Sequence, residues 1–141
     1  MFAPTGRSAT FIVCGMDRFP PDLLARFDEV EEVEVETRSA TGETHRTIIW
    51  VVVVAGQPYV RSVRGVAARW YKELLADPAS AGLVVDGARH AIRFEPAADE
   101  GSIAAVSEAL RAKYGRRARA STAAMLVPRT LRTTMRLVPG G

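Results

Sequence analysis

Apolar and polar residues follow one another at short intervals, which predicts a chain built largely from short strands. Residues 33–38 alternate between apolar and charged side chains, as in a strand with one face in water. Residues 46–55 include an uninterrupted apolar run and predict one buried strand. Residues 59–63 follow a Gly-Gln-Pro turn, and residues 133–138 alternate again before the closing Pro-Gly-Gly.

Turn signals predict hairpins between neighbouring strands. Residues 83–85 and 88–95 flank Asp86-Gly87, a dipeptide suited to the type I′ turn of a two-residue hairpin. Residues 40–43, Ala-Thr-Gly-Glu, form a similar turn after the first strand. The pattern as a whole predicts about six strands, paired mostly with their neighbours in the chain.

Helical periodicity is confined to three segments. Residues 22–30, 65–76 and 103–114 each place apolar side chains three and four positions apart. Gly115 is expected to cap the last of these helices. Residues 116–130 are basic without a clear period, and we expect irregular structure there.

The elements predict a mainly β chain with helices (α+β), arranged as a small antiparallel barrel with helical plugs. An open α/β sheet is less favoured because hairpin signals outnumber crossover helices. Residues 16–141 are expected to form a single domain, since nothing in the sequence marks a boundary. Residues 1–15 look unlike the rest, and we expect a disordered tail or a start-site artefact there.

The composition narrows the kinds of site that the chain can hold. Among 141 residues, Cys14 is the only cysteine, and His45 and His90 are the only histidines. An internal disulfide and a thiolate zinc site are therefore excluded, and no metal site is predicted. No apolar run approaches the roughly 20 residues of a bilayer span, so we expect a cytoplasmic protein.

Charge is segregated along the chain, although the net charge is only +3. Residues 17–43 carry nine acids against three bases, and residues 101–141 carry eight bases against one acid. Such asymmetry can indicate nucleic-acid binding. However, seventeen of the nineteen basic residues are Arg, a bias that a GC-rich coding sequence produces, and the basic tail lacks interleaved aromatic residues. Nucleic acid is therefore the least favoured partner.

The segment 44–72 carries the strongest functional signal. No acidic residue interrupts it, and its basic residues beyond the histidine are Arg46, Arg61, Arg64, Arg69 and Lys72. Arginine guanidinium groups and free N–H groups at a helix start can bind a phosphate, while an apolar strand forms a rigid wall of the binding site. We therefore predict a site for a phosphate-bearing small molecule. The alternative is an ordinary core strand with solvated arginines.

Residues 61–65, Arg-Ser-Val-Arg-Gly, resemble an anion-binding strand-to-helix turn, although the spacing of a Walker loop is absent. Gly65 would let the backbone approach a ligand closely. Arg46 has two possible roles, reaching the same phosphate or pairing with the acidic strand 33–38. Trp70 is expected to pack in the core or at a dimer contact in preference to stacking on a ligand.

No set of catalytic residues stands out. The sequence has no Ser-His-Asp pattern and no compelling pair of carboxylates. His45 lies in or beside a turn, and the sequence places no carboxylate to orient it as a general base. The sequence therefore predicts no catalytic residues, and it does not decide whether the protein is an enzyme. In an enzyme, a bound organic cofactor would carry the difficult chemistry.

Three stretches resemble an uncharacterised bacterial family, domain of unknown function number 2255. They are residues 32–78, 111–115 and 133–139, and the similarity covers about residues 22–139. The family is related to the flavin-type split barrels, the group of pyridoxamine phosphate oxidases and deazaflavin-dependent nitroreductases.

The relation shows in the order and spacing of short motifs. Thr41-Gly42 with Arg46 resembles the Ser-Gly-x-x-Arg turn of the deazaflavin enzymes, with one extra residue in the gap. Residues 60–65 resemble their Ala-Ser-x-Gly-Gly segment. Residues 70–78 resemble their Trp-Tyr-x-Asn-Leu-x-x-Asn-Pro helix.

The resemblance implies a six-stranded split β-barrel of the FMN-binding type, which forms a homodimer and binds FMN or a deazaflavin coenzyme at the barrel edge. The implied activity is that of a nitroreductase-like oxidoreductase acting on a small organic molecule. The candidate cofactor-binding residues are Arg46, Arg61, Ser62, Arg64, Gly65, Arg69 and Trp70.

The chain departs from this pattern at two places. Arg64 stands where the relatives have a glycine, and Ser39-Ala40 stands where they have basic residues. Both departures favour an alternative, a cofactor-free barrel that binds a small apolar molecule as a carrier or an orienting catalyst.

Overall fold

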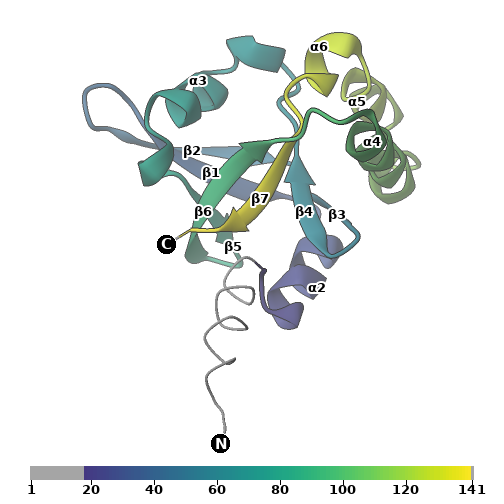
Figure 1. Ribbon diagram of the computed structural model, residues 1–141, viewed down its shortest axis with the longest axis horizontal. Helices are drawn as coiled ribbons and strands as arrows, with labels where there is room; N and C mark the ends of the chain where they lie inside the picture. Colours follow the sequence, from purple (N-terminus) through teal and green to yellow (C-terminus); the bar gives the residue numbers. More distant parts are fainter. Residues whose placement is uncertain (1–17, 141) are drawn as a thin grey trace, which may run out of the picture.

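The computed structural model describes residues 18–140, which fold around a single antiparallel sheet (Figure 1). The expected tail or start-site artefact at residues 1–15 lies outside the described residues. In chain order the strands are β1 (Val33–Arg38), β2 (Thr44–Ile49), β3 (Val52–Val54), β4 (Gln57–Val60), β5 (Gly82–Val85), β6 (Ala88–Pro96) and β7 (Met135–Pro139).

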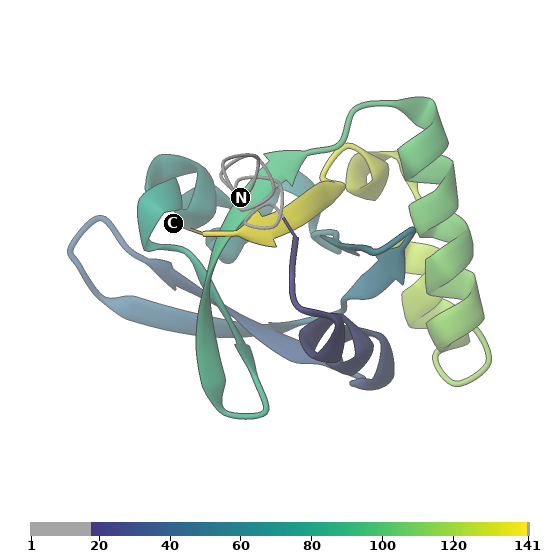
Figure 2. The same cartoon turned by 60° about the horizontal axis from the view of Figure 1, so that its bottom comes forward.

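The strands pair in the order β2-β1-β5-β6-β7-β4-β3, and Figure 2 shows that the sheet curls. The long strand β6 joins the two halves. Residues 88–91 of this strand pair with β5, and residues 92–96 pair with β7. A mixed α+β chain with a curled antiparallel sheet is thus confirmed.

The strand count differs from the predicted six because residues 46–55 form two strands in place of one. β2 pairs with β1, whereas β3 pairs with β4 at the other end of the sheet. The break falls at Trp50 and Val51. An apolar run predicts burial but gives no sign of where a chain leaves one partner strand for another.

Helices cover the sheet on several sides. The α-helices of the described residues are α2 (Pro21–Glu29), α3 (Arg69–Ala76), α4 (Glu100–Tyr114), α5 (Arg119–Ala124) and α6 (Pro128–Leu131). Two single 3₁₀ turns, η1 (Gly65–Ala67) and η2 (Pro78–Ser80), flank α3. No helix among residues 18–140 has the length and apolar character needed to cross a membrane.

Two helix predictions were wrong. Residues 65–76 form η1 and α3 in place of one helix, because Ala68 between them is extended, with φ −62° and ψ 137°. Residues 116–130 were expected to be irregular but contain α5 and α6. These two helices are short and lack a clear apolar stripe, so periodicity could not reveal them.

The turns follow their sequence signals closely. Asp86 and Gly87 have φ values of 52° and 81°, the left-handed pair that a type I′ hairpin requires. Ala55 and Gly56, with φ values of 51° and 77°, make the same kind of turn between β3 and β4. Gly115 is the C-cap of α4, as expected, and its backbone is right-handed with φ −58°.

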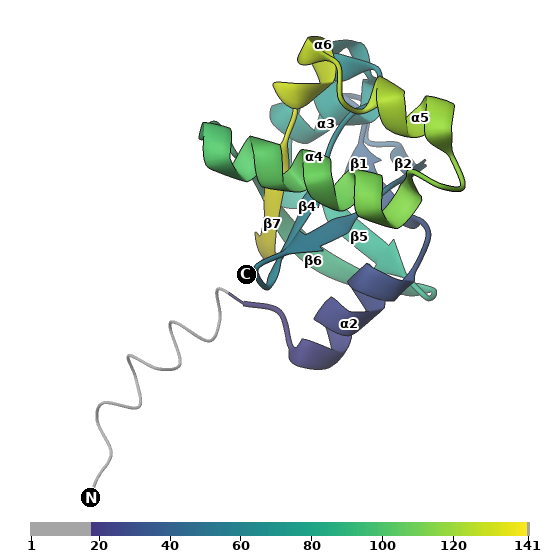
Figure 3. The same cartoon turned by 90° about the vertical axis from the view of Figure 1, so that its right-hand side faces the viewer.

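The core consists of two apolar clusters. The larger one fills the curl of the sheet beneath α2 and α3 and includes Phe27, Leu83 and Leu137. The smaller one lies between β3, β4 and α4, which packs against β3 (Figure 3). Trp50 belongs to the edge of this second cluster, where the chain crosses from β2 to β3.

Candidate functional site

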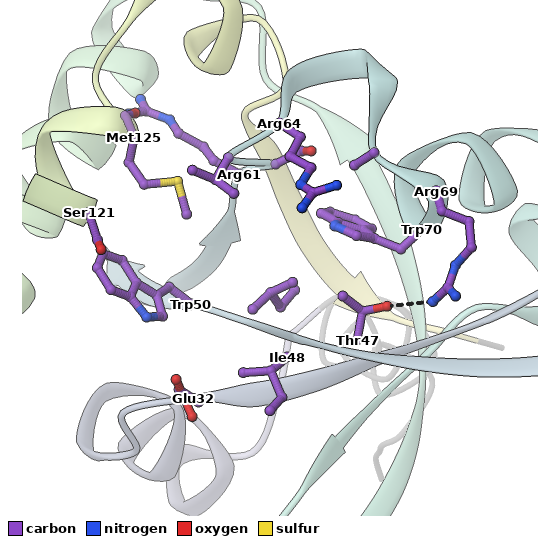
Figure 4. A pocket seen from close by; sticks show the side chains of 14 residues that line it. Glu32, Thr47, Ile48, Trp50, Arg61, Arg64, Arg69, Trp70, Ser121 and Met125 are labelled. Carbon is purple, nitrogen blue, oxygen red and sulfur yellow. Dashed lines mark hydrogen bonds between the residues drawn. The ribbon is translucent and has the colours of Figure 1, made fainter.

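A cavity of about 560 Å³ opens beside the end of β2, where the chain passes to β3 (Figure 4). Its walls come from residues 47–50, residues 61–64 after β4, residues 68–70 at the start of α3, and Glu32, Ser121 and Met125. This volume lies within the roughly 300–1,000 Å³ of small-molecule sites. Segments far apart in the chain therefore converge on one concave surface.

Aromatic rings form two of the walls. The indole of Trp50 stacks on the ring of Tyr114, with centroids 3.9 Å apart and planes inclined by 7°. Trp70 is only 5% exposed and meets the ring of Tyr71 edge-on. Ile48, 60% exposed, extends the apolar surface to the mouth. Flat apolar walls of this kind suit a planar ligand.

Two arginines give the cavity a cationic side. Arg64 is exposed, and its guanidinium has no hydrogen-bond or ion-pair partner among residues 18–140. Arg69 donates to Thr47 Oγ1 at 3.0 Å and lies 3.8 Å from a carboxylate oxygen of Glu73. Glu32 lies on the other side of the cavity from both arginines (Figure 4). The site therefore has a basic side and an acidic side.

Arg61 borders the cavity, but its nitrogens are bound within the protein. The residue is 1% exposed and donates to Thr134 Oγ1, Ser107 Oγ and the carbonyls of Met125 and Ile103, at 2.8 to 3.0 Å. No carboxylate among the described residues pairs with it. Burial, with a smaller effect from the nearby Arg111, lowers the pKa of Arg61 to about 10.

Ser62 and Gly65 also serve the protein's own structure. The Ser62 hydroxyl donates to the Gly65 carbonyl at 2.7 Å, and the Ser62 N–H donates to Thr133 Oγ1 at 2.9 Å. Gly65 has a φ of 69°, and a Cβ there would lie 3.2 Å from the carbonyl oxygen of Arg129 in α6. The close approach that this glycine permits is therefore to α6. Gly65 does not line the cavity.

Arg46 lies outside the cavity lining. Its Nε donates to a Glu36 oxygen at 2.9 Å, which is the pairing with the acidic strand that we considered as one of its two roles. Glu36 also binds Arg89 across the sheet. The Arg89 hydrogen bond, opposed by partial burial and aided by Arg46, holds the pKa of Glu36 below its ordinary value.

His45 has an orienting carboxylate that the sequence did not reveal. Its Nδ1 lies 3.0 Å from Oε2 of Glu73, and the other carboxylate oxygen, Oε1, accepts from Thr37 Oγ1 at 2.8 Å. Burial acts against ionisation of Glu73, but these hydrogen bonds and the charges of His45 and Arg69 hold its pKa below the ordinary value. His45, Glu73 and Thr37 do not line the cavity; Glu73 is near it because it lies beside Arg69, which does.

Lys113 and Tyr114 brace the back of the aromatic wall. Lys113 Nζ donates to the carbonyls of Phe27 and Val51 at 2.8 and 2.7 Å, and Tyr114 Oη donates to the carbonyl of Glu31 at 2.7 Å. Burial lowers the pKa of Lys113 to about 8 and raises that of Tyr114. These contacts tie the end of α4 to the segments beside Trp50.

Of the candidate residues, the cavity lining brings together Arg61, Ser62, Arg64, Arg69 and Trp70. Sequence reasoning missed Glu32, Ser121 and Met125, and it placed Trp50 only within the buried strand expected at residues 46–55. No local pattern marks these residues, because they reach the site only through the fold. Within residues 18–140 no group of His, Cys, Asp and Glu side chains could hold a metal ion.

Comparison with known families agrees with the resemblance. A family model described as "Uncharacterized protein conserved in bacteria (DUF2255)" matches residues 23–137. The chain belongs to this family. A comparison with curated proteins finds no match.

Several solved structures share the fold. ChuZ from Campylobacter jejuni has a TM-score of 0.62 and 9% identity, over 98% of this chain and 63% of ChuZ, so the chain spans less than two thirds of that protein. HutZ, the heme storage protein from Vibrio cholerae, has a TM-score of 0.56 and 12% identity, over 88% of this chain and 92% of HutZ. The conserved hypothetical protein Rv2991 from Mycobacterium tuberculosis has a TM-score of 0.57 and 9% identity, over 88% and 81%. At such identities the similarity shows the fold alone.

Proposed function

We propose that this protein binds a flavin-type nucleotide, FMN or a deazaflavin coenzyme, in the cavity beside Arg64 and acts as an oxidoreductase on a small organic molecule. The observation that carries the proposal is the combination of two indole walls with an unpaired guanidinium, Arg64, in one cavity. A planar heterocycle with an attached phosphate complements both features. The proposal includes a flavin-type split barrel as the fold of the chain.

The cavity residues fit such a group on the side that carries the arginines, and not on the side of Glu32. Arg64 and Arg69 would hold the phosphate, and Trp50 and Trp70 would enclose the ring. Arg61 and Ser62 would support the wall, since their polar groups already have protein partners. When bound, the flavin ring supplies two-electron transfer, and the protein's part is to position it and to exclude water.

The decisive experiment is a titration of the purified protein with FMN. Flavin fluorescence should be quenched as the ring stacks between indoles, and the bound flavin should add an absorption band in the blue. No detectable binding of FMN or of a deazaflavin at high micromolar concentration would overturn the proposal. Reduction of a nitroaromatic compound by the loaded protein would test the enzymatic part.

A second candidate is a cofactor-free barrel that binds an apolar molecule as a carrier or orienting catalyst. It is favoured because Arg61 and Ser62 already make hydrogen bonds within the protein. Of the three residues, only Arg64 has a polar group without a partner that could bind an anion. In that case thermal stability should rise with apolar ligands and stay unchanged with nucleotides, because only a ligand of the native state stabilises it. Heme belongs in the same screen, since HutZ is described as a heme storage protein.

We also propose that the protein forms a homodimer. Exposed apolar side chains include Ile48 at 60% and Val63 at 43%, which line the cavity, and Val66 at 55%, which lies in η1. Packing against a second copy would remove this surface from water. Light scattering of the eluting protein should give twice the mass of the 15.3 kDa chain, and a monomeric mass at micromolar concentration would overturn this part.

A further inference from the structure

Trp70 combines deep burial with an unused hydrogen-bond donor. The residue is 5% exposed, at the start of α3, yet its indole Nε1–H has no acceptor among residues 18–140. Figure 4 shows the indole at the cavity, below Arg64. A buried tryptophan usually finds a partner for this group.

The unused donor is not enclosed by the protein. Among the described residues, the only completely enclosed side-chain nitrogen or oxygen without a partner is Thr122 Oγ1. The unpaired Nε1 of Trp70 is therefore in contact with open space, and Trp70 is a lining residue of the 560 Å³ cavity. An acceptor for this group must come from whatever fills the cavity.

The surroundings of Trp70 are rich in donors. Arg64 lies above it without a partner, and Arg69, the residue before it, adds a second guanidinium. The carboxylate of Glu32 lies on the opposite side. A ligand that uses this side of the cavity must offer acceptors, because a donor facing a donor leaves both unsatisfied.

From this arrangement we infer that Trp70 is a specificity-determining residue that donates a hydrogen bond to an acceptor on the ring of the ligand. The ligand class is an aromatic anion whose ring edge carries a carbonyl oxygen or an unprotonated nitrogen and whose anionic group is held by Arg64. This inference rests on the proposed function and narrows it. An aromatic anion without a ring acceptor would fill the cavity but leave Trp70 unpaired.

Two probes separate recognition of the ring edge from general packing. FMN carries a phosphate and a ring with carbonyl oxygens and unprotonated nitrogens, whereas 1-naphthyl phosphate carries a phosphate and a ring without acceptors. Calorimetric titration of both into the wild type and into Trp70→Phe should show a loss of about tenfold for FMN, the effect of one hydrogen bond. Binding of 1-naphthyl phosphate should change less than twofold.

A measurement on the unaltered protein covers the case in which Trp70→Phe fails to fold. The chain has two tryptophans, so a ¹⁵N-labelled sample gives two indole cross-peaks. Trp50→Phe identifies the Trp70 peak as the one that remains. On addition of FMN this proton should move downfield, as a hydrogen bond requires, and 1-naphthyl phosphate should not move it downfield.

The outcomes separate the inference from the function on which it rests. Equal weakening of both probes by Trp70→Phe, or no downfield shift with bound FMN, would show that Trp70 only packs, and the inference would fall while flavin binding stands. No binding of either probe to the wild type would overturn the proposed function and the inference together.

Discussion

Arg61 Nε donates a hydrogen bond to Thr134 Oγ1 at 2.8 Å and so joins two residues that lie 73 positions apart in the chain. Its other nitrogens reach α4 and the end of α5 through Ser107 and the carbonyl of Met125. One guanidinium thus connects the residue after β4 and the residue before β7 with α4 and the end of α5. Since no carboxylate of residues 18–140 pairs with it, an anion in the cavity would also relieve its uncompensated charge.

The first prediction concerns this brace. Arg61→Met should lower the free energy of unfolding by about 2–4 kcal/mol, because four donors are lost and buried acceptors stay behind without partners. Arg61→Lys should also be destabilising, since an ammonium group cannot reproduce the planar set of hydrogen bonds that the guanidinium makes. Urea unfolding measures both.

The matched control is Arg46→Met, which removes a surface arginine paired with Glu36. A surface pair of this kind contributes at most about 1 kcal/mol. Equal stability of the Arg61 and Arg46 variants would contradict the role of Arg61 as a brace.

The second prediction separates Arg64 from Arg61. Arg64→Met should leave the unfolding free energy unchanged, because Arg64 is exposed and has no partner in the described part of the chain. It should weaken FMN binding by about 10- to 150-fold, the loss of a hydrogen bond to a charged group. Fluorescence titration measures the affinity, with Arg132→Met as a control on an exposed arginine outside the cavity lining. An unchanged affinity would remove Arg64 from the phosphate site.

The third prediction concerns the acidic side of the cavity. Glu32→Gln should tighten FMN binding by about two- to fivefold, since it removes a negative charge from a cavity that receives an anion. The gain should shrink at high salt, because exposed charges are screened. Glu31→Gln changes an exposed neighbour outside the lining and should have no such effect. A loss of affinity in the Glu32 variant would show that this carboxylate contacts the ligand directly.

The fourth prediction follows from Lys113. Its pKa is about 8 in the folded protein against an ordinary value of 10.5. Between these values the unfolded chain holds a proton that the folded chain has released, so the free energy of unfolding rises with pH across this window. Below pH 8 both states are protonated and the full cost of burying the charge remains.

Urea unfolding of the wild type and of Lys113→Met at pH 7.5, 9 and 10 isolates this contribution. The difference in free energy between the two proteins should shift in favour of the wild type as the pH rises. A pH-independent difference would show that Lys113 titrates in the folded protein as it does in the unfolded chain.

Much of the fold follows from local patterns. The alternation at residues 33–38, the Asp86-Gly87 turn and the apolar spacing in residues 103–114 each predicted the element that the structure contains. The break at Trp50 was missed, because residues on both sides of it are apolar and only the choice of partner strand differs.

Local sequence patterns predicted most of the strands, the hairpins, the family and the acid-free basic segment, since each depends on residues that are close together in the chain. The tertiary structure alone decided the use of each arginine. It buried Arg61 among hydroxyls and carbonyls, paired Arg46 with Glu36 and left Arg64 open. Whether a guanidinium is bonded internally or available to a ligand depends on acceptors brought from distant segments, and no local pattern encodes these.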